Sequence, residues 1–90
     1  MTKLEEKLIQ LGYVKLTHNY MTKLTRYKKD FDFSYIHFHI RDNEIVMYGV
    51  SPTCDYQTQY EVDDLQQAFN QLQKDLEVLK GDLSEWKNMN

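Results

Sequence analysis

Apolar residues in the C-terminal third of the chain recur at alternating steps of three and four positions. This spacing is typical of the buried stripe of an amphipathic helix. It predicts a long helix that starts between residues 59 and 64, because Thr58 with Glu61 and Asp63 with Gln66 are competing capping pairs. The helix either ends at Gly81 or continues to Trp86. The stripe consists of Val62, Leu65, Phe69, Leu72, Leu76, Leu79, Leu83 and Trp86.

A shorter helix is predicted over residues 3–11. Thr2 followed by Glu5 forms a capping box, in which each residue satisfies a backbone N–H of the other. Gly12 stands where a left-handed C-terminal cap is favoured. The apolar face of this helix consists of Leu4, Leu8 and Leu11.

Three strands are predicted between the helices. Residues 20–28 are rich in β-branched and aromatic types, whereas residues 14–19 show no pattern that we can assign. Residues 33–40 alternate strictly, and Asp42-Asn43 is a two-residue turn into a third strand that ends at Ser51-Pro52-Thr53. In this register five apolar residues share one face, beneath Leu65, Phe69, Leu72 and Leu76. They are Ile36, Phe38, Ile40, Ile45 and Met47.

The predicted order is therefore α-β-β-β-α, in a single domain over residues 1–90. A three-stranded antiparallel meander with one apolar face needs a cover for that face, and the two amphipathic helices supply it. We expect a two-layer α+β fold with one face of the sheet covered by both helices.

Two segments carry a resemblance to known proteins. LEEKLIQLGY at residues 4–13 and DDLQQAFNQLQKDLEVLK at residues 63–80 resemble the ends of a group of small, uncharacterised proteins encoded by phages and prophages of Gram-positive bacteria. Those proteins share this length and a middle rich in Tyr and Ile. The resemblance implies a phage setting, and it supplies no catalytic residues.

Charge and composition narrow the function classes. The net charge is −3. Residues 1–45 carry eight basic and six acidic side chains (+2), and residues 46–90 carry three and eight (−5). The acidic long helix is thus a poor partner for a phosphate backbone. The single cysteine, Cys54, fits a reducing cytoplasm, and the absence of an apolar run of ~20 residues argues against a membrane protein.

The sequence argues against an enzyme. His37 and His39 lie two positions apart on one strand, but a metal site needs a third ligand, and His18 and Cys54 are the candidates. Asp55 beside Cys54 disfavours a reactive thiolate, and no glycine-rich phosphate loop is present. We expect no catalytic residues, no metal and no cofactor.

Two surfaces are candidates for binding. The first is the sheet face opposite the core, with Tyr35, His37, His39 and Tyr48. Aromatic residues on an open sheet can stack nucleic-acid bases, and Lys23, Arg26, Lys28 and Lys29 lie on or near the neighbouring strand. A nucleic-acid-binding accessory protein is therefore the alternative function. Val46 and Val50 are predicted on the same face. A half-polar outer face is ordinary for an antiparallel sheet, which favours contact with solvent or with a protein partner over nucleic acid.

The second surface is the C-terminal end of the long helix. A helix from about residue 60 to Lys80 is ~30 Å long, whereas strands of seven or eight residues span ~25 Å. One end of the stripe must overhang, and we expect it to carry Leu79, Leu83 and Trp86. This predicts a homodimer or a helix-mediated contact with another protein. The sequence as a whole predicts a small, non-enzymatic interaction or modulator protein of the cytoplasm.

Overall fold

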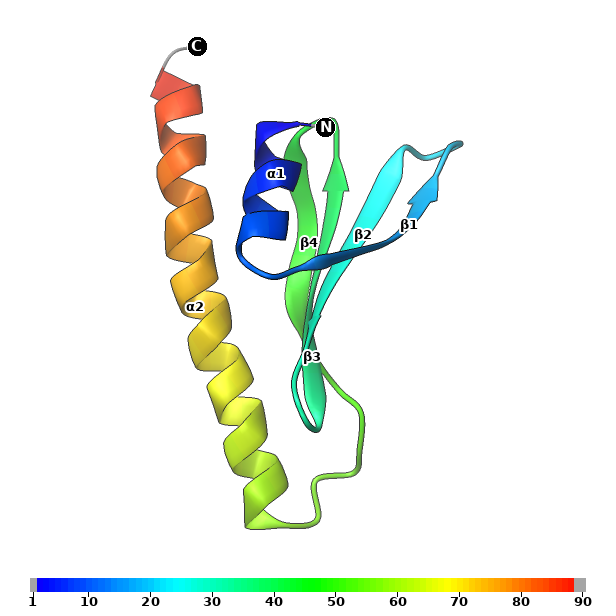
Figure 1. Ribbon diagram of the computed structural model, residues 1–90, viewed down its shortest axis with the longest axis vertical. Coiled ribbons are helices and arrows are strands. Elements are labelled where there is room, and N and C mark those ends of the chain that lie inside the picture. The colour runs from blue at the N-terminus through cyan, green and yellow to red at the C-terminus, as the bar shows by residue number, and fades with distance from the viewer. Residues whose placement is uncertain (1, 89–90) are drawn as a thin grey trace.

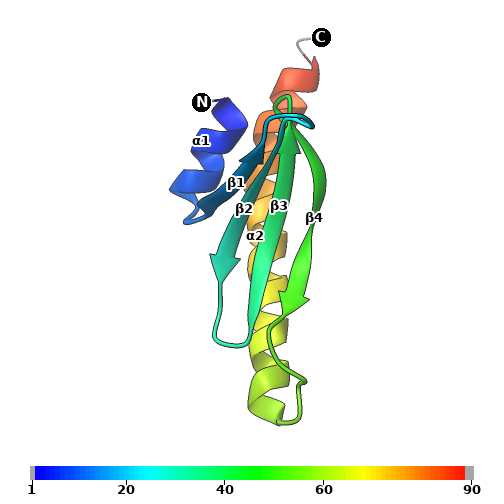
Figure 2. The ribbon, with the colours of Figure 1, turned by 90° about the vertical axis from the view of Figure 1, so that its right-hand side faces the viewer.

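The protein consists of a four-stranded antiparallel sheet with two helices packed against one of its faces (Figures 1 and 2). The computed structural model describes the backbone of residues 2–88 and the side chains of residues 2–80. The elements are α1 (Lys3–Gln10), β1 (Val14–Asn19), β2 (Leu24–Asp30), β3 (Ser34–Arg41), β4 (Glu44–Pro52) and α2 (Gln59–Asn88).

The fold is α+β, as predicted, but the sheet has four strands and not three. The strands are neighbours in chain order, β1-β2-β3-β4, and each pair is antiparallel. The strand predicted over residues 20–28 is wrong at its beginning. Residues 20–23 form the turn between β1 and β2, and the unassigned residues 14–19 form β1.

Local capping signals place the helices. The Thr2 hydroxyl accepts the Glu5 backbone N–H at 3.2 Å, which is the first bond of the predicted capping box. The Glu5 carboxylate accepts from the Thr2 hydroxyl at 3.1 Å, in place of the backbone N–H that the full box would use. The Glu61 backbone N–H donates to the Thr58 hydroxyl at 3.3 Å, so Thr58 and not Asp63 begins α2. The backbone of α2 continues past Gly81 to Asn88.

The core lies between the helices and the inner face of the sheet. α2 packs on β3 and β4, whereas α1 contacts β1 and α2. Ile36, Phe38 and Ile40 of β3 point into this core, as predicted. The remaining buried apolar residues are Leu4, Leu8, Tyr13, Tyr27, Ala68, Leu72, Leu76 and Leu79.

The register of β4 against β3 differs from the prediction beyond the first two residue pairs. Ile40 pairs with Ile45 as expected, but a bulge follows, so that His39 pairs with Met47 and Phe38 with Tyr48. A bulge adds one residue to one strand and reverses the faces beyond it. Met47 is consequently 48% exposed on the outer face, where burial was predicted. Tyr48 moves to the inner face and stacks on Phe38 at 5.8 Å.

The stripe of α2 that faces the sheet is also rotated from the predicted one. Phe69 is 43% exposed and Leu65 is only half-buried. Their places are taken by Ala68, which lets the helix approach closely, and by Asp64, whose carboxylate accepts from Ser34 Oγ at 3.0 Å. A straight helix drifts relative to a strict seven-residue repeat, so one stripe cannot stay buried along the full length of α2.

Candidate functional site

The outer face of the sheet is covered by neither helix, and Figure 2 looks onto it. The pairing register places the side chains of this face. Arg26 of β2 lies opposite His39 of β3, and Met47 of β4 lies on the other side of His39. Lys28 of β2 lies opposite His37. We call this surface the open face. It is formed by Val14, Arg26, Lys28, Tyr35, His37, His39, Met47 and Gly49.

Three aromatic rings run along the centre of the open face. The ring centroids of Tyr35 and His37 are 5.8 Å apart, and those of His37 and His39 are 5.6 Å apart. Lys28 holds its ammonium 4.9 Å from the centroid of the Tyr35 ring and 3.1 Å from the Asp30 carboxylate. The predicted grouping of Tyr35, His37 and His39 is thus observed, with Arg26 and Lys28 beside it. Tyr48 is not part of it.

Gly49 determines how the His37 ring lies. A Cβ atom at position 49 would stand 3.3 Å from His37 Nε2, closer than nearly all contacts of that kind. The glycine therefore lets the imidazole rest across β4. In this position His37 Nδ1 is buried and has no hydrogen-bond partner among the described residues. Such a nitrogen favours the uncharged ring, because a buried charge without a partner is costly.

Both histidines are held in the neutral form. Burial lowers the pKa of His37, and the neighbouring His39 and Arg26 lower it further. Burial also lowers the pKa of His39, again with help from Arg26. At neutral pH the open face is therefore an aromatic and hydrogen-bonding surface, flanked by the cations of Arg26 and Lys28. Acid adds positive charge to it.

The lowered pKa values make stability depend on pH. The unfolded chain takes up protons first as the pH falls below the ordinary histidine value of 6.5. We expect stability to be complete above that pH, to fall below it and to level off once both folded histidines are charged. Urea unfolding at about pH 7.5 and about pH 5.5 measures the loss. A His37→Gln, His39→Gln variant should lose less; an equal loss in both proteins would contradict the prediction.

The second predicted surface is only partly described. Leu79 is fully buried in the core, where α1 packs beside α2, so its side chain does not overhang as predicted. The prediction failed because α1 covers this part of the helix. Leu83 and Trp86 lie outside the residues whose side chains are described.

The remaining candidates do not come together. His18 lies on the inner side of the β1–β2 hairpin, with Nδ1 2.6 Å from Thr25 Oγ1, and Cys54 is half-buried in the loop before α2. Over the described residues, no three His, Cys, Asp or Glu side chains are grouped to hold a metal ion. Over the same residues, no helix is long and apolar enough to cross a membrane.

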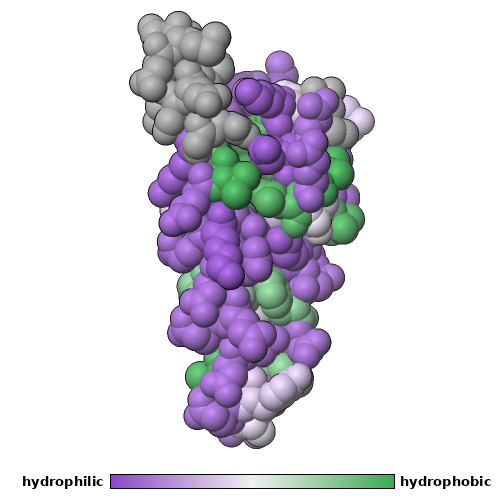
Figure 3. All heavy atoms as spheres, turned by 60° about the vertical axis from the view of Figure 1, so that its left-hand side comes forward, coloured by the Kyte–Doolittle hydropathy of each residue, from purple (hydrophilic) through white to green (hydrophobic). Residues whose placement is uncertain are grey.

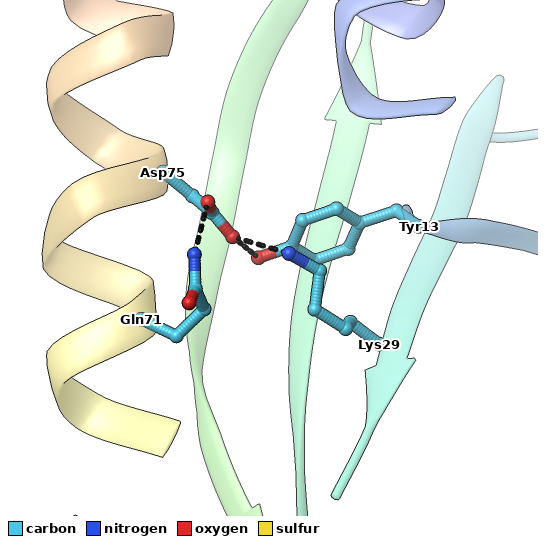
Figure 4. Close-up of polar contacts among 4 residues, drawn as sticks. All are labelled: Tyr13, Lys29, Gln71 and Asp75. Atoms are coloured by element: carbon cyan, nitrogen blue, oxygen red, sulfur yellow. Dashed lines mark hydrogen bonds and ion pairs between the residues drawn. The ribbon is translucent and has the colours of Figure 1, made fainter. Parts of the chain in front are cut away.

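A buried polar cluster, which sequence reasoning missed, joins α2 to β2 and to the residue before β1 (Figure 4). Asp75 Oδ2 accepts from the Tyr13 hydroxyl at 2.8 Å and from the Lys29 ammonium at 2.9 Å, and Gln71 donates to Oδ1 at 2.9 Å. Burial and this hydrogen bond raise the pKa of Tyr13 well above its usual range. Each group has its partner inside the cluster, so its role is to hold the layers together.

Comparisons of the chain with protein-family models, with curated proteins and with solved structures found no match.

Proposed function

We propose that the protein is a small non-enzymatic modulator that acts by binding another protein through the open face. The observation that carries the proposal is the placement of both helices on one side of the sheet, which leaves the aromatic row of β3 uncovered. The resemblance of both ends of the chain to phage and prophage proteins makes a host or phage protein the partner. The setting is then the cytoplasm of the bacterial cell.

The residue types on the open face suit a protein partner. Tyr, Met and Arg are enriched at the centres of protein interfaces, and Tyr35, Met47 and Arg26 all lie on the open face, with Arg26 and Met47 on either side of His39. Val14, 63% exposed, extends the apolar area toward the β1 edge. By contrast, most of the surface in Figure 3, the side on which α2 lies, is hydrophilic. The partner we infer presents apolar side chains with a carboxylate that meets Arg26.

Nucleic acid is the alternative, because Arg26 and Lys28 lie beside the row of rings. Two features favour protein. Asp30 neutralises Lys28, whose ammonium also lies near the Tyr35 ring that a base would stack on. The chain as a whole is negatively charged. Gel shifts against single- and double-stranded nucleic acid at two salt concentrations test the alternative, since phosphate-driven binding weakens steeply with salt.

An open-face variant should lose the protein partner. We expect Arg26→Glu, Met47→Glu to reduce capture from nuclease-treated lysates of infected or lysogenic cells by about tenfold or more, because it places two carboxylates at the centre of the interface. Quantitative mass spectrometry measures the captured protein. The control, Gln73→Glu, Lys74→Glu, makes the same charge change on the exposed side of α2 and should capture like the unaltered protein. Equal capture by all three proteins would contradict the proposal.

We also propose that the protein forms a homodimer, through the end of α2 and not through the open face. Ile9 of α1 and Val78 of α2 are both more than 40% exposed. They add apolar surface to the contact predicted at Leu83 and Trp86. A Leu83→Lys, Trp86→Lys variant should sediment as a monomer and keep its fold, because it puts charges at the predicted contact and leaves every residue of the described core unchanged. If the unaltered protein sediments as a monomer at tens of micromolar, self-association is wrong.

A further inference from the structure

A cleft on the other side of the sheet stands apart from the open face. It has a volume of about 300 Å³, at the small end of the range for small-molecule sites. Three segments far apart in sequence form it: the first turn of α1, the inner side of the β1–β2 hairpin and the β3–β4 turn. In Figure 1 these segments all lie at the end of the molecule where the chain begins, with the β1–β2 hairpin set apart from the other two.

Two carboxylates line the cleft. Glu5 is fixed by the Tyr27 hydroxyl, which donates to Oε2 at 2.6 Å, and by the Thr2 hydroxyl on Oε1. Burial acts to raise the pKa of Glu5, but these bonds and the nearby Lys15 outweigh it and hold the pKa below its usual value. Asp42 comes from the β3–β4 turn, at a positive φ of 54°. Two hydroxyl donors leave Glu5 with further acceptor positions, because a carboxylate has about four.

Two aromatic rings stand at the rim of the same cleft, where Tyr20 is 85% exposed. The His18 ring is oriented by its bond to Thr25 Oγ1, and Tyr20 meets it edge to face at 4.8 Å and 82°. Ile40, almost fully buried, adds an apolar part of the wall. Aromatic faces next to carboxylates attract organic cations, and an apolar wall accommodates the stem that carries the charge.

From this arrangement we propose that the cleft binds an organic cation, an ammonium or guanidinium group on a short apolar stem. The cation lies between the Glu5 and Asp42 carboxylates, and the stem lies toward Ile40 and the rings. Lys23 also lines the cleft and opposes the ligand by repulsion. The ligand comes either from a free small molecule or from a lysine or arginine side chain of a protein. The site is separate from the open face, so neither proposal depends on the other.

The test is a titration of the protein with n-butylguanidinium and n-butylammonium, followed by amide chemical shifts, with n-butyrate as the anionic control. We expect saturable shifts around Glu5, Thr25 and Asn43 with the cations and none with butyrate. Glu5→Gln, which keeps an acceptor oxygen for the Thr2 hydroxyl, should weaken binding about tenfold, because it removes a charge-assisted bond. Asp42→Asn should weaken binding about threefold and Lys23→Met strengthen it about threefold, as expected for charges in partial contact with water.

Glu6→Gln is the matched control, because it makes the same change on the exposed side of α1. The proposal is overturned if no cation gives saturable shifts, or if Glu6→Gln weakens binding as much as Glu5→Gln does. Melting temperatures of all variants confirm that they are folded. Titration with acetyl-Gly-Arg-Gly-amide then identifies the source: tighter binding than butylguanidinium supports a protein side chain, and equal or weaker binding supports a free cation.

Discussion

Asp75→Ala should destabilise the protein by about 3–5 kcal/mol, the usual cost of removing one partner from a buried ion pair. Asp75 is 2% exposed and accepts from Tyr13, Lys29 and Gln71. Without it, the Lys29 ammonium and the Tyr13 hydroxyl lose the carboxylate oxygen to which both donate. Domains of this size are stabilised by only about 5–15 kcal/mol, so the variant should unfold at much lower urea concentration.

A triple variant distinguishes the cost of leaving buried groups unpaired from the contribution that the whole polar cluster makes to stability. Tyr13→Phe, Lys29→Met, Asp75→Leu removes the hydroxyl and both charges together. Hydrophobic replacement of a whole buried pair is often neutral, so we expect most of the stability to return. If Asp75→Ala unfolds at nearly the same urea concentration as the unaltered protein, the cluster is solvated and does not hold α2 to the sheet.

The features that the sequence predicted correctly depend on neighbouring residues. The Thr2 hydroxyl caps α1 by accepting the Glu5 backbone N–H, as expected. Asp42 and Asn43 both have positive φ, 54° and 62°, as a two-residue hairpin turn requires. The buried face of β3 follows strict alternation. In each case a few adjacent residues contain the whole physical signal.

β1 could not be predicted from a buried face, because it has none. All but one of its residues are exposed, and its register shifts between Lys15 and Thr17. An edge strand is held by backbone bonds to one neighbour, which any side chain permits. Apolar and polar residues alternate at the start of β1, in the segment VKLTHN, and this weak pattern is the feature of the sequence that indicates a strand.

The candidate sites depended on details that spacing does not contain. One extra residue in β4 moved Met47 onto the open face and removed Tyr48 from it. Asp75 reads as a polar residue beside the apolar stripe, and its partners lie 46 and 62 positions away in the chain. The cleft likewise combines three separate segments. Such long-range pairs are set by how the layers pack, and no local pattern records them.

Phe38→Ala should cost about 3–5 kcal/mol, because it leaves a cavity at the centre of the core. Phe38 is fully buried, with Tyr13 against it edge to face at 5.2 Å and Tyr48 stacked on it at 5.8 Å. Thermal unfolding followed by circular dichroism measures the loss. Met47→Ala, on the open face of the neighbouring strand, should change stability by at most about 1 kcal/mol. A Phe38→Ala protein that melts cooperatively near the unaltered temperature, with Met47→Ala the more damaging change, would mean that the two faces of the sheet are assigned the wrong way round.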